Sequence, residues 1–272
     1  MKYTIKSNKY IAKNLFYILP FAIIPAFFLS ISTDEKALIS VLQKVFGSKP
    51  QQLTFSELFR AISILNFASW QSIVFGIIGI ILIIVCVAMM MAMIEKHFRI
   101  GKRTYRGLFS KLNDNLISTG GYAFLMVILY EVWTLITTIG VFIFSKIFIN
   151  AVAYVMMALF FVIMHIALIY IIGQIYLWLP CMQITGFKAI HALYYSNRMV
   201  SSVKWHILLG QIAMLLGAEV LIGLCACFAP SPIIFTILTT VLYGWMIMLF
   251  CVRMQVVYFE REHLDRADVF RY

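Results

Sequence analysis

The chain contains six apolar runs, each long enough to cross a membrane as a helix. About 20 consecutive apolar residues span the hydrocarbon core, so each run predicts a transmembrane helix. Hydrophobic residues make up 63% of the sequence and charged residues 12%, against roughly 45–50% and 25% in soluble domains. The sequence therefore predicts an all-α integral membrane protein with no room for a large soluble catalytic domain. The runs cover residues 15–32, 70–94, 118–144, 149–179, 206–228 and 233–257.

The first run has an alternative interpretation as a cleaved signal peptide, because Ser30 and Ser32 resemble a small-x-small cleavage site. The run is long for a signal peptide, and Pro20 and Pro25 lie early in it. A retained span is therefore favoured, and a proline inside a helix also favours a kink.

The net charge of +11 raises the question of nucleic acid. In a membrane protein, however, basic residues gather in cytoplasmic loops, which face anionic lipid. We therefore expect membrane lipid, in particular anionic phospholipid, as the partner and no nucleic acid. The five cysteines lie in or beside apolar runs without a C-x-x-C pair, so we expect neither a metal site nor a disulfide framework.

Three basic polar stretches alternate with the apolar runs, and each has the spacing of an amphipathic helix. In the second stretch Arg99, Arg103 and Arg106 follow i, i+4, i+7, and in the third Lys188 and Arg198 share one helix face. We predict cytoplasmic amphipathic helices in the membrane interface. Their cations are candidates for binding lipid head groups, and a solvated surface without further role is the alternative. The stretches cover residues 1–14, 95–115 and 180–206.

Each basic stretch is followed by two apolar runs, which predicts three repeated units of one amphipathic helix, or elbow, and one helical hairpin. Residue identity between the units is low, so three independent surface helices are the alternative. We expect a single membrane domain over residues 1–272, with units 1–94, 95–179 and 180–257 and a cytoplasmic tail 258–272.

The longest stretch between spans, residues 33–69, predicts two short amphipathic helices. Thr33 is the expected cap of the first helix, and Thr54 with Glu57 forms a capping box for the second. Both helices are expected to lie on the membrane or to cover the mouth of the bundle.

The distribution of basic residues predicts the orientation in the membrane. Seventeen of the 22 lysines and arginines fall on one side of a six-span arrangement, at the two chain ends and in the second and third basic stretches. Cytoplasmic loops carry this excess, so both termini are predicted to be cytoplasmic.

The third basic stretch carries a resemblance to a known family. Residues 186–196 read Gly-Phe-Lys-Ala-Ile-His-Ala-Leu-Tyr-Tyr-Ser, and Lys-Trp-His-Ile follows at 204–207. This pattern resembles a bacterial membrane protein family related to the membrane domain of glycerophosphoryl diester phosphodiesterase, and residues 101–112 carry a weaker form of it. The resemblance implies a six-helix bundle in the bacterial cytoplasmic membrane. The phosphodiesterase barrel has no counterpart in the sequence, so that activity is not expected.

Three ionisable residues fall near the middle of apolar runs: Glu131, His165 and Glu219. A charge there costs about 2.5–3.5 kcal/mol on insertion scales, so each residue needs a partner, water or a neutral state. A shared intramembrane polar site for a proton or a substrate is one interpretation. Structural hydrogen bonds between helices, with Thr134, Thr138 or His165 as partners, are the other.

No catalytic motif occurs in the sequence: it lacks Walker, G-x-G-x-x-G, H-E-x-x-H and G-x-S-x-G patterns. We therefore expect a non-enzymatic protein without a cofactor that binds or moves a lipid or small amphiphilic solute. The alternative is a structural or accessory subunit of an export or envelope-maintenance complex, which would have a protein partner or form a homo-oligomer. A cavity reaching the polar residues would favour the first function.

Overall fold

The computed structural model describes residues 2–46, 53–147, 150–228 and 230–262. It is 88% helical, and no strand occurs in the described residues. The helices in these ranges are α1 (Lys2–Ser32), α2 (Glu35–Phe46), α3 (Phe55–Ile62), α4 (Trp70–Ile100), α5 (Leu108–Ile147), α6 (Asn150–Gln174), α7 (Trp178–Thr185), α8 (Ala189–Ser201), α9 (Lys204–Ala226) and α10 (Pro232–Arg261).

Six helical segments of the described chain are long and apolar enough to cross a membrane. They are α1, α4, α5, the α6–α7 segment from Val152 to Thr185, α9 and α10. The predicted all-α fold with six apolar spans is confirmed at this level. Five of the six exceed their predicted lengths because the helices continue into the polar stretches, as α5 does from Leu108, whereas α9 has the predicted length.

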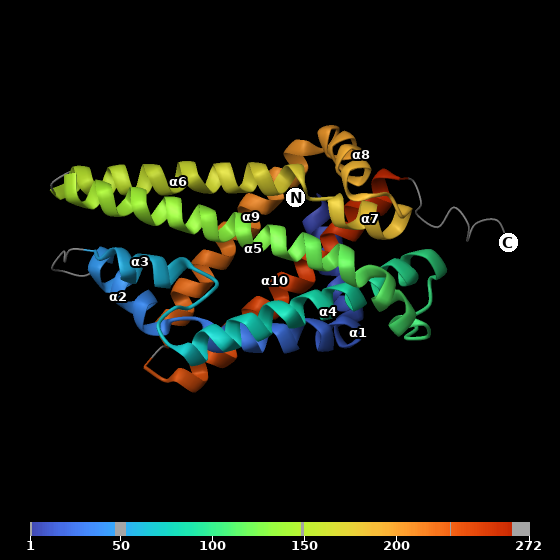
Figure 1. Ribbon diagram of the computed structural model, residues 1–272, viewed down its shortest axis with the longest axis horizontal. Coiled ribbons are helices and arrows are strands. Elements are labelled where there is room, and N and C mark those ends of the chain that lie inside the picture. The colour runs from blue at the N-terminus through green and yellow to red at the C-terminus, as the bar shows by residue number, and fades with distance from the viewer. Residues whose placement is uncertain (1, 47–52, 148–149, 229, 263–272) are drawn as a thin grey trace.

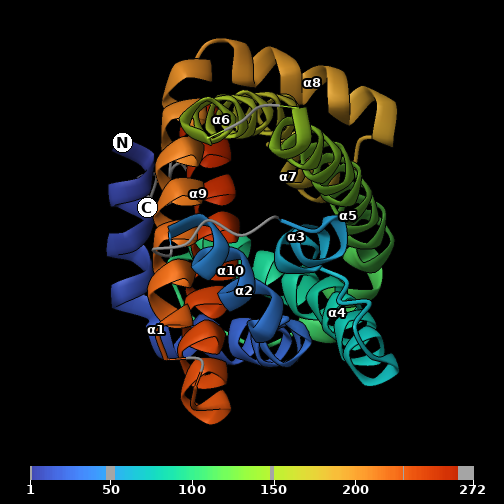
Figure 2. The same ribbon diagram turned by 90° about the vertical axis from the view of Figure 1, so that its left-hand side faces the viewer.

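The long helices form a ring. Around it α10 contacts α4, α4 contacts α5, α5 contacts α6, α6 contacts α9, and α9 contacts α10 again. The helix α1 lies along α10 and α4 on the outside of the ring. Figure 1 shows the ring from the side, and Figure 2 looks into it from the end where α2 and α3 lie.

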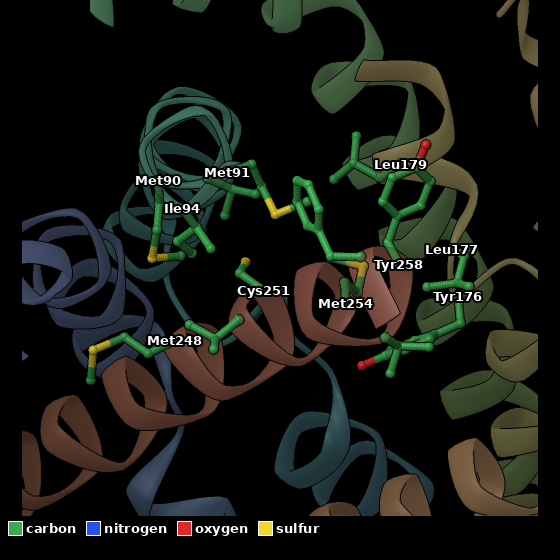
Figure 3. Close-up of a cluster of buried hydrophobic side chains, with 14 of the residues drawn as sticks. Met90, Met91, Ile94, Tyr176, Leu177, Leu179, Met248, Cys251, Met254 and Tyr258 are labelled. Carbon is green, nitrogen blue, oxygen red and sulfur yellow. The ribbon is translucent and has the colours of Figure 1, made fainter. Parts of the chain in front are cut away.

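The main hydrophobic core fills the opposite end of the ring, near the two chain ends. Its side chains come from α1, α4, α10 and the segment around α7, and include Met90, Tyr176, Leu179, Met254 and Tyr258 (Figure 3). Tightly packed interiors of this kind tolerate few voids. Any sizeable cavity must therefore lie toward α2 and α3.

The N-terminal helix α1 is interrupted at Asn14, where φ is −124° and ψ is 21°. The side-chain amide of Asn14 donates to the carbonyl of Tyr10 at 2.9 Å. This residue is where the predicted basic stretch 1–14 meets the predicted span. Pro20 and Pro25 lie inside the helix beyond it.

The second basic stretch does not form the predicted amphipathic helix. The helix α4 ends at Ile100, and α5 begins at Leu108. Gly101 and Gly107 have φ of 74° and 72°, a left-handed conformation that glycine adopts without steric cost and that ends a helix. Arg99 therefore ends α4, while Arg103 and Arg106 stand in a loop.

The third basic stretch does contain a helix, although a shorter one than predicted. Gly186, with φ of 70°, separates α7 from α8. Lys188 is the N-cap of α8, and Arg198 lies in its last turn. In Figure 1, α8 lies across the end of the bundle opposite to α2 and α3.

Residues 33–69 form the two predicted short helices, α2 and α3. The predicted N-cap at Thr54 is confirmed, because its hydroxyl accepts from the Glu57 N–H at 3.4 Å. The Glu57 carboxylate accepts from the Thr54 hydroxyl at 2.6 Å, whereas in a complete capping box it accepts from the backbone N–H. The predicted cap of α2 is wrong. Asp34 takes that role by accepting from the Ala37 N–H at 3.0 Å, because α2 begins at Glu35, directly after it. The Thr33 hydroxyl instead donates to the carbonyl of Leu29.

Candidate functional site

A cavity of 850 Å³ lies inside the ring of helices, at the end covered by α2 and α3. All helices except α7 and α8 contribute to its lining, which is mostly apolar. Leu38 and Leu42 of α2 and Leu58 of α3 close one side. We call α2, α3 and the connection 63–69 the cap. The prediction that these segments cover the mouth of the bundle agrees with this arrangement.

Few polar side chains reach the cavity, and Glu219 of α9 is the carboxylate among the described lining residues. The side chain of Glu219 is 35% exposed, whereas the side chain of its partner, His165 on α6, is 6% exposed. Glu219 therefore faces the cavity, and His165 lies behind it.

The contacts of His165 fix the arrangement of protons in this pair. Its Nδ1 lies 2.8 Å from the carbonyl oxygen of Phe161, which can only accept, so Nδ1 carries a hydrogen. Its Nε2 makes a short hydrogen bond with Oε1 of Glu219. That bond requires one proton, held either by an imidazolium or by a carboxylic acid. In both cases the pair has no net charge, which suits burial in a membrane.

Aromatic rings hold His165 in place. The indole ring of Trp133 meets the imidazole edge to face, with ring centres 4.7 Å apart, and Phe161 lies 4.1 Å away. The Trp133 Nε1 donates to the carbonyl of Met164 at 2.7 Å, which fixes the indole ring in turn. The imidazole of His165 is therefore held in place by side chains of α5 and α6, and the Glu219 carboxyl reaches it from α9.

Glu131 makes its hydrogen bonds elsewhere. Its carboxylate accepts from the N–H groups of Ile64 at 2.9 Å and Leu65 at 3.2 Å and from the Ser63 hydroxyl at 2.9 Å. The neighbouring Tyr130 donates its hydroxyl to the carbonyl of Ile62 at 3.0 Å. Of the three predicted intramembrane residues, the structure thus joins His165 and Glu219, and Glu131 anchors the cap to α5.

Of the alternative partners predicted for the intramembrane acids, His165 is the one observed. The hydroxyls of Thr134 and Thr138 are buried and have no hydrogen-bond partner within the described chain. The contact between Glu131 and residues 63–65 was missed from the sequence. The polar residue Ser63 follows an amphipathic helix directly in the sequence. This position indicates that Ser63 needs a hydrogen-bonding partner, but it does not indicate which residue is the partner.

Ion pairs hold the two helices of the cap together. Arg60 of α3 donates its Nε to Asp34 at 2.8 Å, and Lys44 of α2 donates to Glu57 at 2.6 Å. The hydrogen bond from Lys44 is the main cause that lowers the pKa of the Glu57 carboxyl to about 2. Arg60 also lines the cavity, but its charge is matched by Asp34.

The five predicted head-group residues are all exposed and lie at the end of the bundle opposite to the cap. Arg99 contacts Glu95 at 3.2 Å, and Arg103 donates to the carbonyl of Lys13 at 2.8 Å, so the loop after α4 lies against α1. Arg106 belongs to the same loop, and Lys188 and Arg198 belong to α8.

Arg253 lies in the sixth predicted span, and no partner was predicted for it; in predicting the orientation it was counted among the charges of the cytoplasmic side. The structure places it inside α10, with 1% of its area exposed. Its Nη2 donates to the carbonyls of Ile207 at 2.8 Å and His206 at 3.2 Å, and its Cζ lies 5.5 Å from the centre of the Tyr176 ring. Arg253 therefore ties α10 to α9.

The described residues contain no group of three or more His, Cys, Asp or Glu side chains placed to share a metal ion. Their most distinctive polar contact is the hydrogen bond of the His165–Glu219 pair at the wall of an apolar cavity. No protein-family model matches the chain, and neither a curated protein nor a solved structure matches it at a significant level.

Proposed function

We propose that this protein is a non-enzymatic integral membrane protein that binds a lipid or small amphiphilic solute. It would move this ligand by binding it at one place and releasing it at another. The observation that supports this proposal is the 850 Å³ cavity with Glu219 at its wall. Its volume falls within the roughly 300–1,000 Å³ of small-molecule sites, which are mostly apolar with a few placed polar groups. An apolar chain fits the lining of leucine and isoleucine side chains, and a polar end group fits the wall at Glu219.

Access to the cavity follows from its walls. The cap covers the end of the ring, and neighbouring long helices form the sides. A ligand that enters or leaves must therefore pass between the cap and the ring or between two long helices. Because Glu131 anchors the cap to α5, the passage between the cap and the ring is the more restricted of the two routes.

We further propose that the protein lies in the bacterial cytoplasmic membrane with both termini cytoplasmic. The basic loop after α4 and the helix α8 lie at the end of the bundle opposite to α2 and α3, and the positive-inside rule predicts that this basic end faces the cytoplasm. On this proposal Arg99, Arg103, Arg106, Lys188 and Arg198 contact anionic phospholipid, at about 1 kcal/mol per cation near the surface. A repeat of three hairpin units belongs to the same proposal, with α8 as the interfacial helix of the third unit and the loop between α4 and α5 in place of a helix in the second.

A cavity-filling variant tests the proposed function. Gly223 lines the cavity, and a Cβ added there meets nothing within 4 Å, so Gly223→Phe fills the cavity without a backbone clash. Gly217 lies on the same helix, outside the lining residues, with equally open space, and Gly217→Phe is the matched control.

The measurement is native mass spectrometry of each protein purified with its membrane lipids. We expect wild type and Gly217→Phe to retain a lipid or amphiphile and Gly223→Phe to lose it. Equal retention by all three proteins would contradict binding in the cavity. A retained protein subunit in place of a small molecule would favour the accessory-subunit function instead.

A further inference from the structure

The cavity wall holds a carboxyl group that shares a proton with a histidine. The binding of a neutral lipid does not require such a group. Among the described lining residues Glu219 is the acid, and the lining cation Arg60 is already matched by Asp34. The cavity wall can therefore carry one net negative charge, and it does so only when the His165–Glu219 pair gives up its proton.

Aromatic side chains surround the same space. A ring face carries partial negative charge and attracts a cation within about 6 Å, most strongly where water is excluded. Apolar walls with aromatic faces and one carboxylate recognise a lipophilic cation. The lining aromatic residues are Tyr130, Trp133, Tyr154, Phe161 and Tyr243.

We propose that the ligand of this cavity is a lipophilic cation, such as an amphiphile with a quaternary ammonium or phosphonium group, and that its binding displaces the proton of the His165–Glu219 pair. This inference rests on the proposed function and specifies its ligand class.

The charge balance explains the exchange. The empty pair holds one proton and has no net charge, so a cation that entered without exchange would leave an uncompensated charge in a low-dielectric site. Once the proton has left, Glu219 is a carboxylate that pairs with the cation, and His165 is neutral with its Nδ1 hydrogen still bonded to Phe161. One proton passes to water for each cation bound, and the site remains neutral.

Other titratable groups around the pair do not replace it in this exchange. Tyr130 of α5 and Tyr243 of α10 face the same space and are phenols, which are neutral near pH 7. Arg60 of α3 is paired with Asp34, and Glu131 of α5 is bonded to residues 63–65. The proton therefore comes from the His165–Glu219 pair.

Proton displacement fixes the pH dependence of binding. Where one proton leaves for each ligand bound, the affinity rises about tenfold per pH unit for as long as the empty pair remains protonated. By the same linkage, a lower pH favours release of the cation. A proton gradient across the membrane could then drive the cation from one side to the other.

The test uses two ions of nearly equal size and opposite charge, tetraphenylphosphonium and tetraphenylborate, with the full-length protein in neutral maltoside micelles. Equilibrium binding is measured from pH 5 to pH 8, and binding to Gly223→Phe is subtracted as the contribution outside the cavity. We expect the phosphonium ion to bind at least tenfold more tightly than the borate ion at pH 8. Its affinity should fall about tenfold per unit as the pH decreases, and an indicator dye should record one proton released per ion bound.

Glu219→Gln keeps a hydrogen-bonding amide but cannot become charged, so it should lose at least tenfold in phosphonium affinity together with the pH dependence. Its binding of the borate ion should not weaken, which shows that the cavity is intact. Equal binding of the two ions by wild type, or phosphonium binding without proton release, would overturn the proposal whatever the variant does.

The two proposals fail in different ways. If wild type retains a lipid in the mass spectrometry experiment and binds the two ions equally, the cavity binds an amphiphile and the cation specificity is wrong. If wild type neither retains a lipid nor binds either ion above Gly223→Phe, the proposed function itself is wrong.

Discussion

The carboxylate of Glu131 accepts a hydrogen bond from the backbone N–H of Ile64 at 2.9 Å, which ties the end of α3 to the middle of α5. The N–H of Leu65 donates to the same oxygen at 3.2 Å. Backbone donors in a partly buried connection need acceptors, and here one side chain supplies them. Glu131 is therefore the residue that holds the cap in place over the cavity.

The first prediction separates this anchoring role from a role in proton exchange. Glu131→Gln keeps an oxygen that accepts from Ile64, whereas Glu131→Leu leaves the partly buried N–H of Ile64 without this acceptor, at about 1–3 kcal/mol. The N–H of Leu65 keeps a second acceptor, the Ser63 hydroxyl at 3.1 Å. We expect hydrogen exchange of the α3 amides to accelerate strongly in Glu131→Leu and weakly in Glu131→Gln. Exchange in α8, which lies at the end of the bundle opposite to the cap, should not change in either variant. Equal exchange in α3 of all three proteins would show that Glu131 does not hold the cap.

The second prediction concerns the pH dependence of the cap. The hydrogen bond from Lys44 lowers the pKa of the Glu57 carboxyl to about 2 in the folded protein, below its ordinary value of 4.5. A lowered pKa means that the pair stabilises the cap fully above pH 4.5 and loses this contribution as the pH falls toward 2. The ¹³C carboxyl resonance of Glu57 should titrate near pH 2 in wild type and at higher pH in Lys44→Met. The same midpoint in both proteins would contradict the role of Lys44.

Local chemistry explains which parts of the fold were predictable. The apolar runs identified six spans because length and composition alone decide whether a helix can cross a membrane. The Thr54 cap was predictable because both partners lie within one turn. The break between α4 and α5 was missed although Gly101 and Gly107 stood in the sequence, because the helical spacing of the arginines was given more weight than two residues that favour left-handed backbone.

The parts of the site that the sequence could not supply depend on contacts between distant segments. Glu131 and Ile64 are 67 residues apart, and His165 and Glu219 are 54 apart. An acidic side chain inside the membrane needs a hydrogen-bonding partner. Which residue becomes that partner depends on how each helix is rotated about its axis. The burial of Arg253 was unpredictable for the same reason, since an arginine near the end of an apolar run can reach a cytoplasmic loop or be buried against another helix.

The third prediction tests the close approach of α9 and α10. A Cβ at Gly210 would lie 2.2 Å from Nη2 of Arg253, so Gly210→Ala must displace the guanidinium from the carbonyl of Ile207. Hydrogen bonds to charged groups contribute about 1.5–3 kcal/mol, and a loss of this size should lower the Tm measured in detergent. Gly217→Ala on the same helix meets nothing within 4 Å and should leave the Tm unchanged or raise it, because alanine favours helix by about 1 kcal/mol over glycine. A Tm for Gly210→Ala equal to that of Gly217→Ala would show that Arg253 can be displaced without cost.

The last prediction tests the orientation of the bundle in the membrane. A probe near Lys49 would fall outside the described residues, so Ala68 in the cap connection serves for one end, and Lys102 and Ser201 serve for the other. All three positions are exposed, and each is changed to cysteine in a chain whose five native cysteines are replaced by serine or alanine. In intact cells a membrane-impermeant maleimide should label Ala68→Cys, whereas Lys102→Cys and Ser201→Cys should react only after permeabilisation, because the basic end faces the cytoplasm. The reverse pattern would place the cap and the mouth of the cavity inside the cell. Labelling at Ala68 and at only one of the two basic positions would instead require an odd number of crossings between Lys102 and Ser201, and the six-span arrangement would then be wrong.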